Sequence, residues 1–174
     1  MLSSTPIPYT YWVEPTRFLA GIYPGADEEA KARKKLRQIL KAGITFFLDL
    51  TEADKLKPYA LLLQEEATIL GLSAKHQRLS VSDFGVPTPS EMLHILDTID
   101  AALGAGQGVY LHCWFGIGRT GTVVGCYLVR HGMSGEAALD KITQLREVIP
   151  GSGLRSSPET EEQRQMILNW SVGT

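Results

Sequence analysis

The sequence predicts an α/β fold with a mostly parallel central sheet flanked by helices and a pair of strands at the N-terminus. Short apolar runs alternate along the chain with longer segments whose apolar residues recur at helical spacing. Residues 44–50 form a continuous apolar run, which is typical of a strand buried on both faces of a parallel sheet. With 174 residues and 44% hydrophobic content, the chain can bury one ample core, so we expect a single domain over residues 1–174.

The expected elements follow one another in a regular order. Residues 11–13 and 18–22 form the N-terminal strand pair. A helix from Asp27 to about Ala42 begins with acidic residues, carries basic residues in its later turns and ends at Gly43. The remaining expected elements are the strand 44–50, a helix near 58–70, the strand 75–81, a helix after Thr88, the strand 108–111, and the helices 122–129, 134–148 and 158–170.

Two of these helices carry explicit start signals. Thr88 and Glu91 form a capping box with a proline at the first helical position, and a stripe of apolar residues follows and predicts a core face. Its members are Met92, Ile95, Leu96, Ile99 and Leu103. For the last helix, Ser157 is the expected cap and Pro158 the first helical residue.

A glycine-spaced loop, residues 112–122, lies between a predicted strand end and a predicted helix start. Backbone N–H groups at a helix N-terminus lack intrahelical partners, and the helix dipole adds positive potential there, so an anion is the expected occupant. The same features and Arg119 favour the thiolate of Cys113. Arg119 offers a planar fork of donors suited to two phosphate oxygens. The glycines of the loop let the backbone approach the anion closely.

The pattern His-Cys-x-x-Gly-x-x-Arg-Thr-Gly resembles the active-site signature of the cysteine-dependent protein tyrosine phosphatase superfamily, in particular its small, bacterial-type, dual-specificity-like branch. The matching residues are His112, Cys113, Gly116, Arg119, Thr120 and Gly121. Residues 11–25 also resemble the N-terminal strand pair of that branch. The resemblance implies a phosphomonoesterase that needs no metal or other cofactor, with Cys113 as nucleophile.

The resemblance also implies roles for the other loop residues. His112 would orient the loop and favour the thiolate, although a buried histidine of purely structural role fits as well. Thr120 would help the thiolate leave when the phosphocysteine is hydrolysed. The substrate phosphate would lie against the loop residues Trp114, Phe115, Gly116, Ile117, Gly118 and Arg119. Trp114 and Phe115 are bulky and neutral where lipid-directed members carry lysine, which argues against a highly charged inositol polyphosphate.

Expulsion of an alkoxide or phenoxide also requires a general acid. Asp83 follows the strand 75–81 in a loop, as in the Asp-loop of the family, although an ordinary turn-forming aspartate would look the same. Other carboxylates fit this role less well: Asp49, Asp97, Asp100 and Asp140. Gln163 corresponds to the glutamine that positions the hydrolytic water in several branches, with Gln165 and a plain surface helix as alternatives. Arg155 could contact an anionic substrate.

The composition limits which partners and which cell compartment are expected for this protein. The net charge of −2 gives no overall attraction to nucleic acid or to anionic membranes. We find no secretory signal and no run of about 18 apolar residues, so a cytoplasmic monomer acting on a phosphorylated protein or peptide is expected. Of the two cysteines, Cys126 belongs to the core. No histidine or cysteine cluster has metal-ligand spacing.

The leading hypothesis is therefore a phosphatase acting on phosphotyrosine, and also on phosphoserine or phosphothreonine. A phosphoinositide or small-molecule phosphatase on the same machinery is a second hypothesis. A pseudophosphatase that binds phosphorylated partners is a third, but it gains nothing from an intact Cys113, Arg119 and Asp83. A sulfurtransferase or an arsenate reductase would also use a loop cysteine but leaves Asp83 unexplained.

Overall fold

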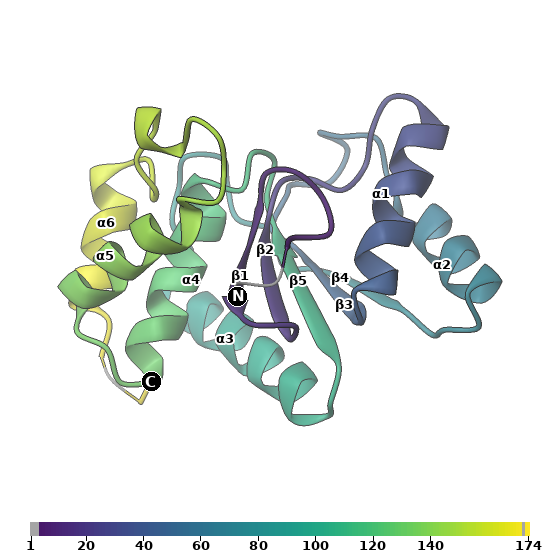
Figure 1. The fold of residues 1–174 in the computed structure, drawn as a ribbon. Coiled ribbons are helices and arrows are strands. Elements are labelled where there is room, and N and C mark those ends of the chain that lie inside the picture. The colour runs from purple at the N-terminus through teal and green to yellow at the C-terminus, as the bar shows by residue number, and fades with distance from the viewer. Residues whose placement is uncertain (1–3, 172) are drawn as a thin grey trace.

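The computed structural model describes residues 4–171 and 173–174. The elements follow the predicted order, with a single turn of 3-10 helix (η1) before the last helix (Figure 1). They are β1 (Thr10–Glu14), β2 (Phe18–Gly21), α1 (Glu29–Lys41), β3 (Ile44–Asp49), α2 (Ala60–Ile69), β4 (Lys75–Arg78), α3 (Pro89–Gly104), β5 (Gly108–His112), α4 (Gly118–Arg130), α5 (Gly135–Arg146), η1 (Ser152–Leu154) and α6 (Glu161–Asn169).

The five strands form one sheet in the order β1-β2-β5-β3-β4. β1 pairs with β2 in antiparallel orientation, and the other neighbours are parallel. Helices α1 and α2 cover one face, and helices α3 to α6 cover the other (Figure 1). The predicted fold class, a mostly parallel sheet flanked by helices with an N-terminal strand pair, is confirmed.

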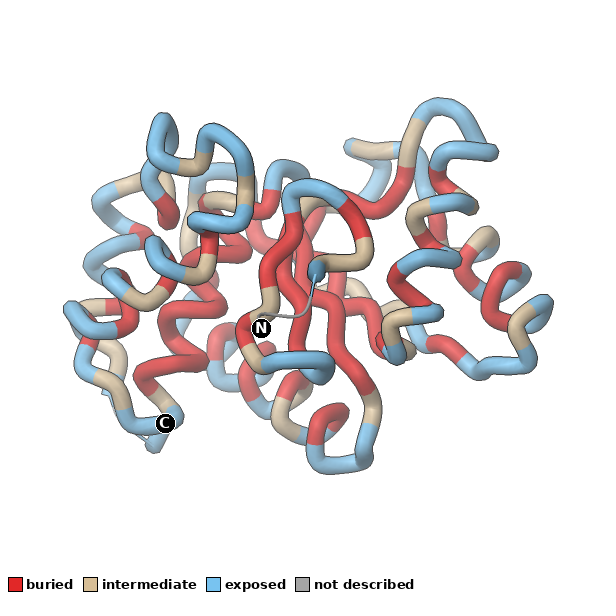
Figure 2. The backbone as a smooth tube through the Cα atoms, in the orientation of Figure 1, coloured by how far each residue is buried: buried red, intermediate tan, exposed pale blue. Residues whose placement is uncertain are grey.

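The central strand, β5, contributes side chains to two cores, because successive residues of a strand point to opposite faces of the sheet. Val109 and Leu111 pack with α3 and α4, whereas Tyr110 packs with α1 and α2. All three residues are fully buried. Buried residues accordingly follow the strands and the inner faces of the helices, while the outer loops are exposed (Figure 2).

The capping box that the sequence predicts for α3 is present. Thr88 accepts a hydrogen bond from the backbone of Glu91, and the Glu91 carboxylate accepts one from the backbone of Thr88. Every residue of the predicted apolar stripe is buried on the inner face of this helix. Cys126, expected in the core, is buried on α4.

Two predicted helix starts are wrong. Helix α4 begins at Gly118 rather than at residue 122, so Arg119 and Thr120 belong to its first turn. Helix α6 begins at Glu161 with Thr160 as its cap, and neither Ser157 nor Pro158 is part of it. The Ser157 hydroxyl instead donates to the Ile117 carbonyl at 2.7 Å, so a contact with the glycine-spaced loop replaces the expected cap. Within the described residues, no helix is both long and apolar enough to cross a membrane.

Because Ile99 is fully buried on the inner face of α3, we expect Ile99→Ala to lower the free energy of unfolding by about 2–5 kcal/mol through lost burial and a cavity. Leu93 on the same helix is 38% exposed and provides the matched control, Leu93→Ala. Urea unfolding of both variants checks this, and similar losses for the two would contradict the assigned core face.

Candidate active site

The glycine-spaced loop lies at the carboxyl end of the central strand. β5 ends at His112, Cys113 follows directly, and α4 begins at Gly118. Gly116 has a φ of 72°, and a Cβ atom at this position would overlap the backbone of Gly21. The Trp114 carbonyl accepts a hydrogen bond from the Tyr23 backbone at 2.9 Å. The loop is therefore held between the end of β2 and the N-terminus of α4, and a helix N-terminus is a position that favours an anion.

This segment holds a buried thiol and a buried hydroxyl. Cys113 is a free thiol that is only 3% exposed. Thr120 is fully buried, and its hydroxyl has no hydrogen-bond partner among the described residues. An unpaired buried hydroxyl costs free energy. This hydroxyl is thus available to a group that enters the site.

Arg119 joins the loop to the segment that carries Asp83. Its Nη2 lies 3.0 Å from Asp83 Oδ1, and its Nη1 donates to the Val81 carbonyl at 3.0 Å. The Arg119 side chain is 5% exposed and that of Asp83 is 45% exposed. The structure thus places Asp83 beside the loop, and its role as general acid stays a prediction. Because the carboxylate is half exposed, their ion pair contributes at most about 1 kcal/mol and can open for a ligand.

His112 is a buried, neutral residue behind the loop. Its Nδ1 lies 3.0 Å from the Cys113 carbonyl, and its Nε2 lies 2.6 Å from the Tyr59 hydroxyl. Since a carbonyl can only accept, Nδ1 carries the proton and Nε2 accepts from Tyr59. Burial lowers the pKa of His112 to about 4. His112 therefore fixes the backbone of Cys113 and is not placed to act as a charged acid at neutral pH.

Asp49 anchors a polar cluster that the sequence analysis missed. This fully buried carboxylate accepts hydrogen bonds from Thr51, from His76 at 3.0 Å and from Arg78 at 3.1 Å, and lies 4.0 Å from His112 Nδ1. Burial alone would raise its pKa, but the hydrogen bond from His76, the nearby His112 and the bonds from Thr51 hold that pKa well below its usual value. The pairing of β3 with β5 would have indicated this cluster, because it sets Asp49 directly opposite His112.

Gln163 lies at the junction of three segments. Its Nε2 donates to the Gly85 carbonyl of the Asp83 segment at 3.0 Å, and its Oε1 accepts from the backbone of Glu159 and Thr160. It is fully buried, and a Cβ atom on Gly118 would lie 3.1 Å from Gln163 Oε1. The structure therefore places Gln163 against both loops, whereas Gln165 bonds Glu161 on the exposed side of α6.

Two aromatic side chains form the outer edge of the loop. Trp114 and Phe115 are 45% and 50% exposed, and their rings stack at 5.0 Å. The Arg155 guanidinium lies over the Phe115 ring at 5.4 Å and forms an ion pair with Glu159. The site entrance is therefore apolar and aromatic, with one arginine beside it.

Comparison with known proteins decides the family. Residues 24–133 match the family described as "Tc-R-P: Polymorphic toxin system, DSP-PTPase phosphatase". The chain belongs to this family. The matched range includes the Asp83 segment and the whole Cys113 loop but ends before Gln163.

Two relatives that are named as dual-specificity or tyrosine phosphatases match the chain over 56% and 89% of its length. Mouse dual specificity protein phosphatase CDC14B is 38% identical over 98 residues, which are 56% of this chain and 19% of the relative. The Arabidopsis thaliana protein named phosphatidylinositol 3,4,5-trisphosphate 3-phosphatase and protein-tyrosine-phosphatase PTEN1 is 28% identical over 157 residues, 89% of this chain and 36% of the relative. The chain thus spans well under half the length of either relative.

The fold agrees with a solved phosphatase structure. The crystal structure of Tk-PTP in the active form superposes with a TM-score of 0.70 at 22% identity and covers 92% of this chain and 94% of that chain.

The neutral, buried state of His112 predicts a loss of stability in acid. The unfolded chain takes up a proton on His112 below its ordinary pKa of 6.5, whereas the folded protein does so only near 4. Between these values the unfolded state binds more protons, so the free energy of unfolding falls as pH falls, by up to about 3 kcal/mol. Urea unfolding at pH 7.0 and 4.5 measures this change. We expect a shallower pH dependence in His112→Gln, and equal slopes would show that His112 does not carry the effect.

Proposed function

We propose that this protein hydrolyses phosphotyrosine, and also phosphoserine or phosphothreonine, in phosphorylated proteins through a phosphocysteine intermediate. The contact of Arg119 with both Asp83 and Val81 carries this proposal. That contact brings the Cys113 loop, the Arg119 guanidinium and the Asp83 carboxyl group together at the carboxyl end of the parallel strands. A pure phosphate-binding module would have no use for Asp83 at this position.

The first step transfers the phosphoryl group to the enzyme. The phosphate lies in the loop against its amides, and Arg119 turns its fork from Asp83 to two phosphate oxygens. The Cys113 thiolate attacks phosphorus, forming the S–P bond as the bond to the leaving oxygen breaks. Asp83, once released from Arg119, takes up a proton from solvent and gives it to that oxygen. Because His112 is neutral and buried, it holds the Cys113 backbone and does not transfer the proton.

The second step restores the enzyme. Asp83, now a carboxylate, takes a proton from water as the water attacks phosphorus, and the S–P bond breaks to release inorganic phosphate and the thiolate. The Thr120 hydroxyl, which has no hydrogen-bond partner in the described part of the chain, can donate to the departing sulfur. Gln163 holds the Asp83 segment through Gly85 and has a second amide N–H that can orient the water.

The aromatic entrance favours a protein substrate over an inositol polyphosphate. Trp114 and Phe115 themselves present half-exposed neutral rings instead of the cations that a multiply charged head group would need at these positions. The neighbouring Arg155 is paired with Glu159. Phosphoinositide hydrolysis is the second candidate, since the name of the PTEN1 relative includes both a lipid and a protein activity. A free nucleophilic thiol also suits the reducing cytoplasm, where we place the protein.

Replacement of the proposed nucleophile should abolish turnover while the fold persists. In Cys113→Ser the hydroxyl is a far weaker nucleophile at neutral pH, so phosphate release from phosphotyrosine peptides should fall below detection with peptide binding retained. Wild-type enzyme in EDTA is the companion measurement and should keep full activity. Activity of the variant within tenfold of wild type would remove Cys113 from this role, and inactivation by EDTA would indicate a metallophosphatase.

Replacement of the proposed acid should depend on the leaving group. Asp83→Asn keeps an oxygen that can accept from Arg119 but cannot protonate the leaving oxygen. We expect kcat to fall by roughly 10²–10⁴ for phosphoserine or phosphotyrosine peptides, and far less for an aryl phosphate with an activated leaving group. Steady-state kinetics on both substrate types measures the difference. An equal loss on both would assign Asp83 a binding role instead.

A further inference from the structure

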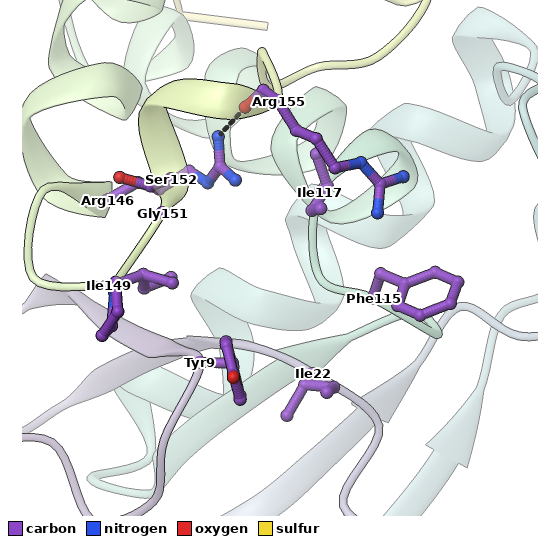
Figure 3. Close-up of a pocket in the computed structure, with 10 residues that line it drawn as sticks. Tyr9, Ile22, Phe115, Ile117, Arg146, Ile149, Gly151, Ser152 and Arg155 are labelled. Carbon is purple, nitrogen blue, oxygen red and sulfur yellow. Dashed lines mark hydrogen bonds between the residues drawn. The ribbon is translucent and has the colours of Figure 1, made fainter.

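A mostly apolar cavity of about 320 Å³ opens beside the Cys113 loop. Phe115 and Ile117 of the loop form one wall, and Tyr9 and Ile22 from the N-terminal segments lie below them (Figure 3). Ile149, in the segment after α5, closes the opposite side. A cavity of this size and composition suits a large apolar side chain.

Two arginines border this cavity on the side away from Tyr9 and Ile22. Arg146 is 5% exposed, and its Nη1 donates to the Arg155 carbonyl at 3.1 Å (Figure 3). Its Nε is buried without a hydrogen-bond partner among the described residues. In the same described part of the chain, Arg146 forms no ion pair with a carboxylate, whereas Arg155 pairs with Glu159. A buried guanidinium without a carboxylate is uncommon, and it gives this border a positive potential that favours an anionic group.

Two residues of the Cys113 loop line the cavity. Phe115 and Ile117 stand on either side of Gly116, the residue whose left-handed backbone lets the loop turn. A group that enters the cavity while phosphate lies in the loop must therefore be close to the phosphorylated residue in the substrate chain. An extended peptide advances about 3.3–3.6 Å per residue, so its immediate neighbours are the side chains within reach.

We propose that this cavity is a substrate subsite. It takes a large apolar side chain within two residues of the phosphorylated one, and its arginine border takes an adjacent carboxylate. The subsite rests on the proposed phosphoprotein activity and specifies which phosphopeptides the enzyme prefers.

The first test uses the wild-type enzyme and phosphotyrosine peptides that differ only beside the phosphotyrosine. Four peptides combine leucine or alanine at one neighbouring position with glutamate or lysine at the next, and a second set places these pairs on the other side. We expect kcat/KM to be roughly tenfold or more higher for leucine than for alanine in one of the two sets, since apolar pockets discriminate on this scale. Within that set, the leucine-glutamate peptide should be the best substrate.

The second test changes the cavity while leaving the loop intact. Ile149→Ser should remove most of the preference for leucine and keep turnover of para-nitrophenyl phosphate, which is too small to reach the cavity. Leu154→Ser is the matched control, because Leu154 lies in the same segment, is 90% exposed and does not line the cavity. Ser152→Trp, which fills the cavity from its edge, provides the same readout if Ile149→Ser does not fold.

The outcomes separate the subsite from the activity on which it rests. Turnover of all peptides within a twofold range, or an unchanged leucine preference in the folded cavity variants, would overturn the subsite alone. Failure to hydrolyse any phosphopeptide, with hydrolysis of phosphatidylinositol phosphate in vesicles, would overturn the proposed function and the peptide subsite together. In that case, loss of the lipid activity in the cavity variants would indicate an acyl chain as the occupant.

Discussion

Three parallel strands of the sheet reach the same level at His112, and the position of the Cys113 loop depends on this register. Gly21 of β2 and Asp49 of β3 are the partners of His112 on its two sides. The neighbouring strands thus fix the carboxyl end of β5 before the loop begins. Tyr59 and the Cys113 carbonyl then fix the imidazole itself. A loop anchored in this way can hold its amides toward an anion without reorganising when the anion arrives.

Arg119 links this loop to the segment that carries Asp83. Its contact with the Val81 carbonyl is buried, whereas its contact with Asp83 involves a half-exposed carboxylate. In the proposed mechanism, phosphate replaces this carboxylate at a low cost in free energy. The phosphate then forms a stronger, forked interaction with Arg119. In this proposed mechanism the same exchange frees Asp83 for proton transfer, so phosphate binding and release of the acid become a single event. Gln163 tethers the same segment through its hydrogen bond to the Gly85 carbonyl.

Local signals predicted most of the fold and the centre of the site. The capping box at Thr88 and the buried run 44–50 each specify an element from a few neighbouring residues, and the glycine spacing predicted the loop between β5 and α4. Tertiary contacts decided the exceptions. Ser157 looked like a cap, but its hydroxyl bonds Ile117, while Thr160 and Gln163 form a capping box that was equally readable in the sequence. The cluster around Asp49 joins residues far apart in the chain and could not be found without strand order.

The central claim is that the phosphoryl group passes through a covalent bond to Cys113. Mixing the Asp83→Asn enzyme with radioactively labelled para-nitrophenyl phosphate, whose leaving group needs no proton, and quenching in acid during the first turnover tests this claim directly. We expect label on the proteolytic peptide that contains Cys113, and this label should show the pH stability of a thiol phosphate. Enzyme treated with iodoacetate before mixing should carry no label. Label on a histidine, or phosphate release during the first turnover with no labelled enzyme at any time, would contradict it.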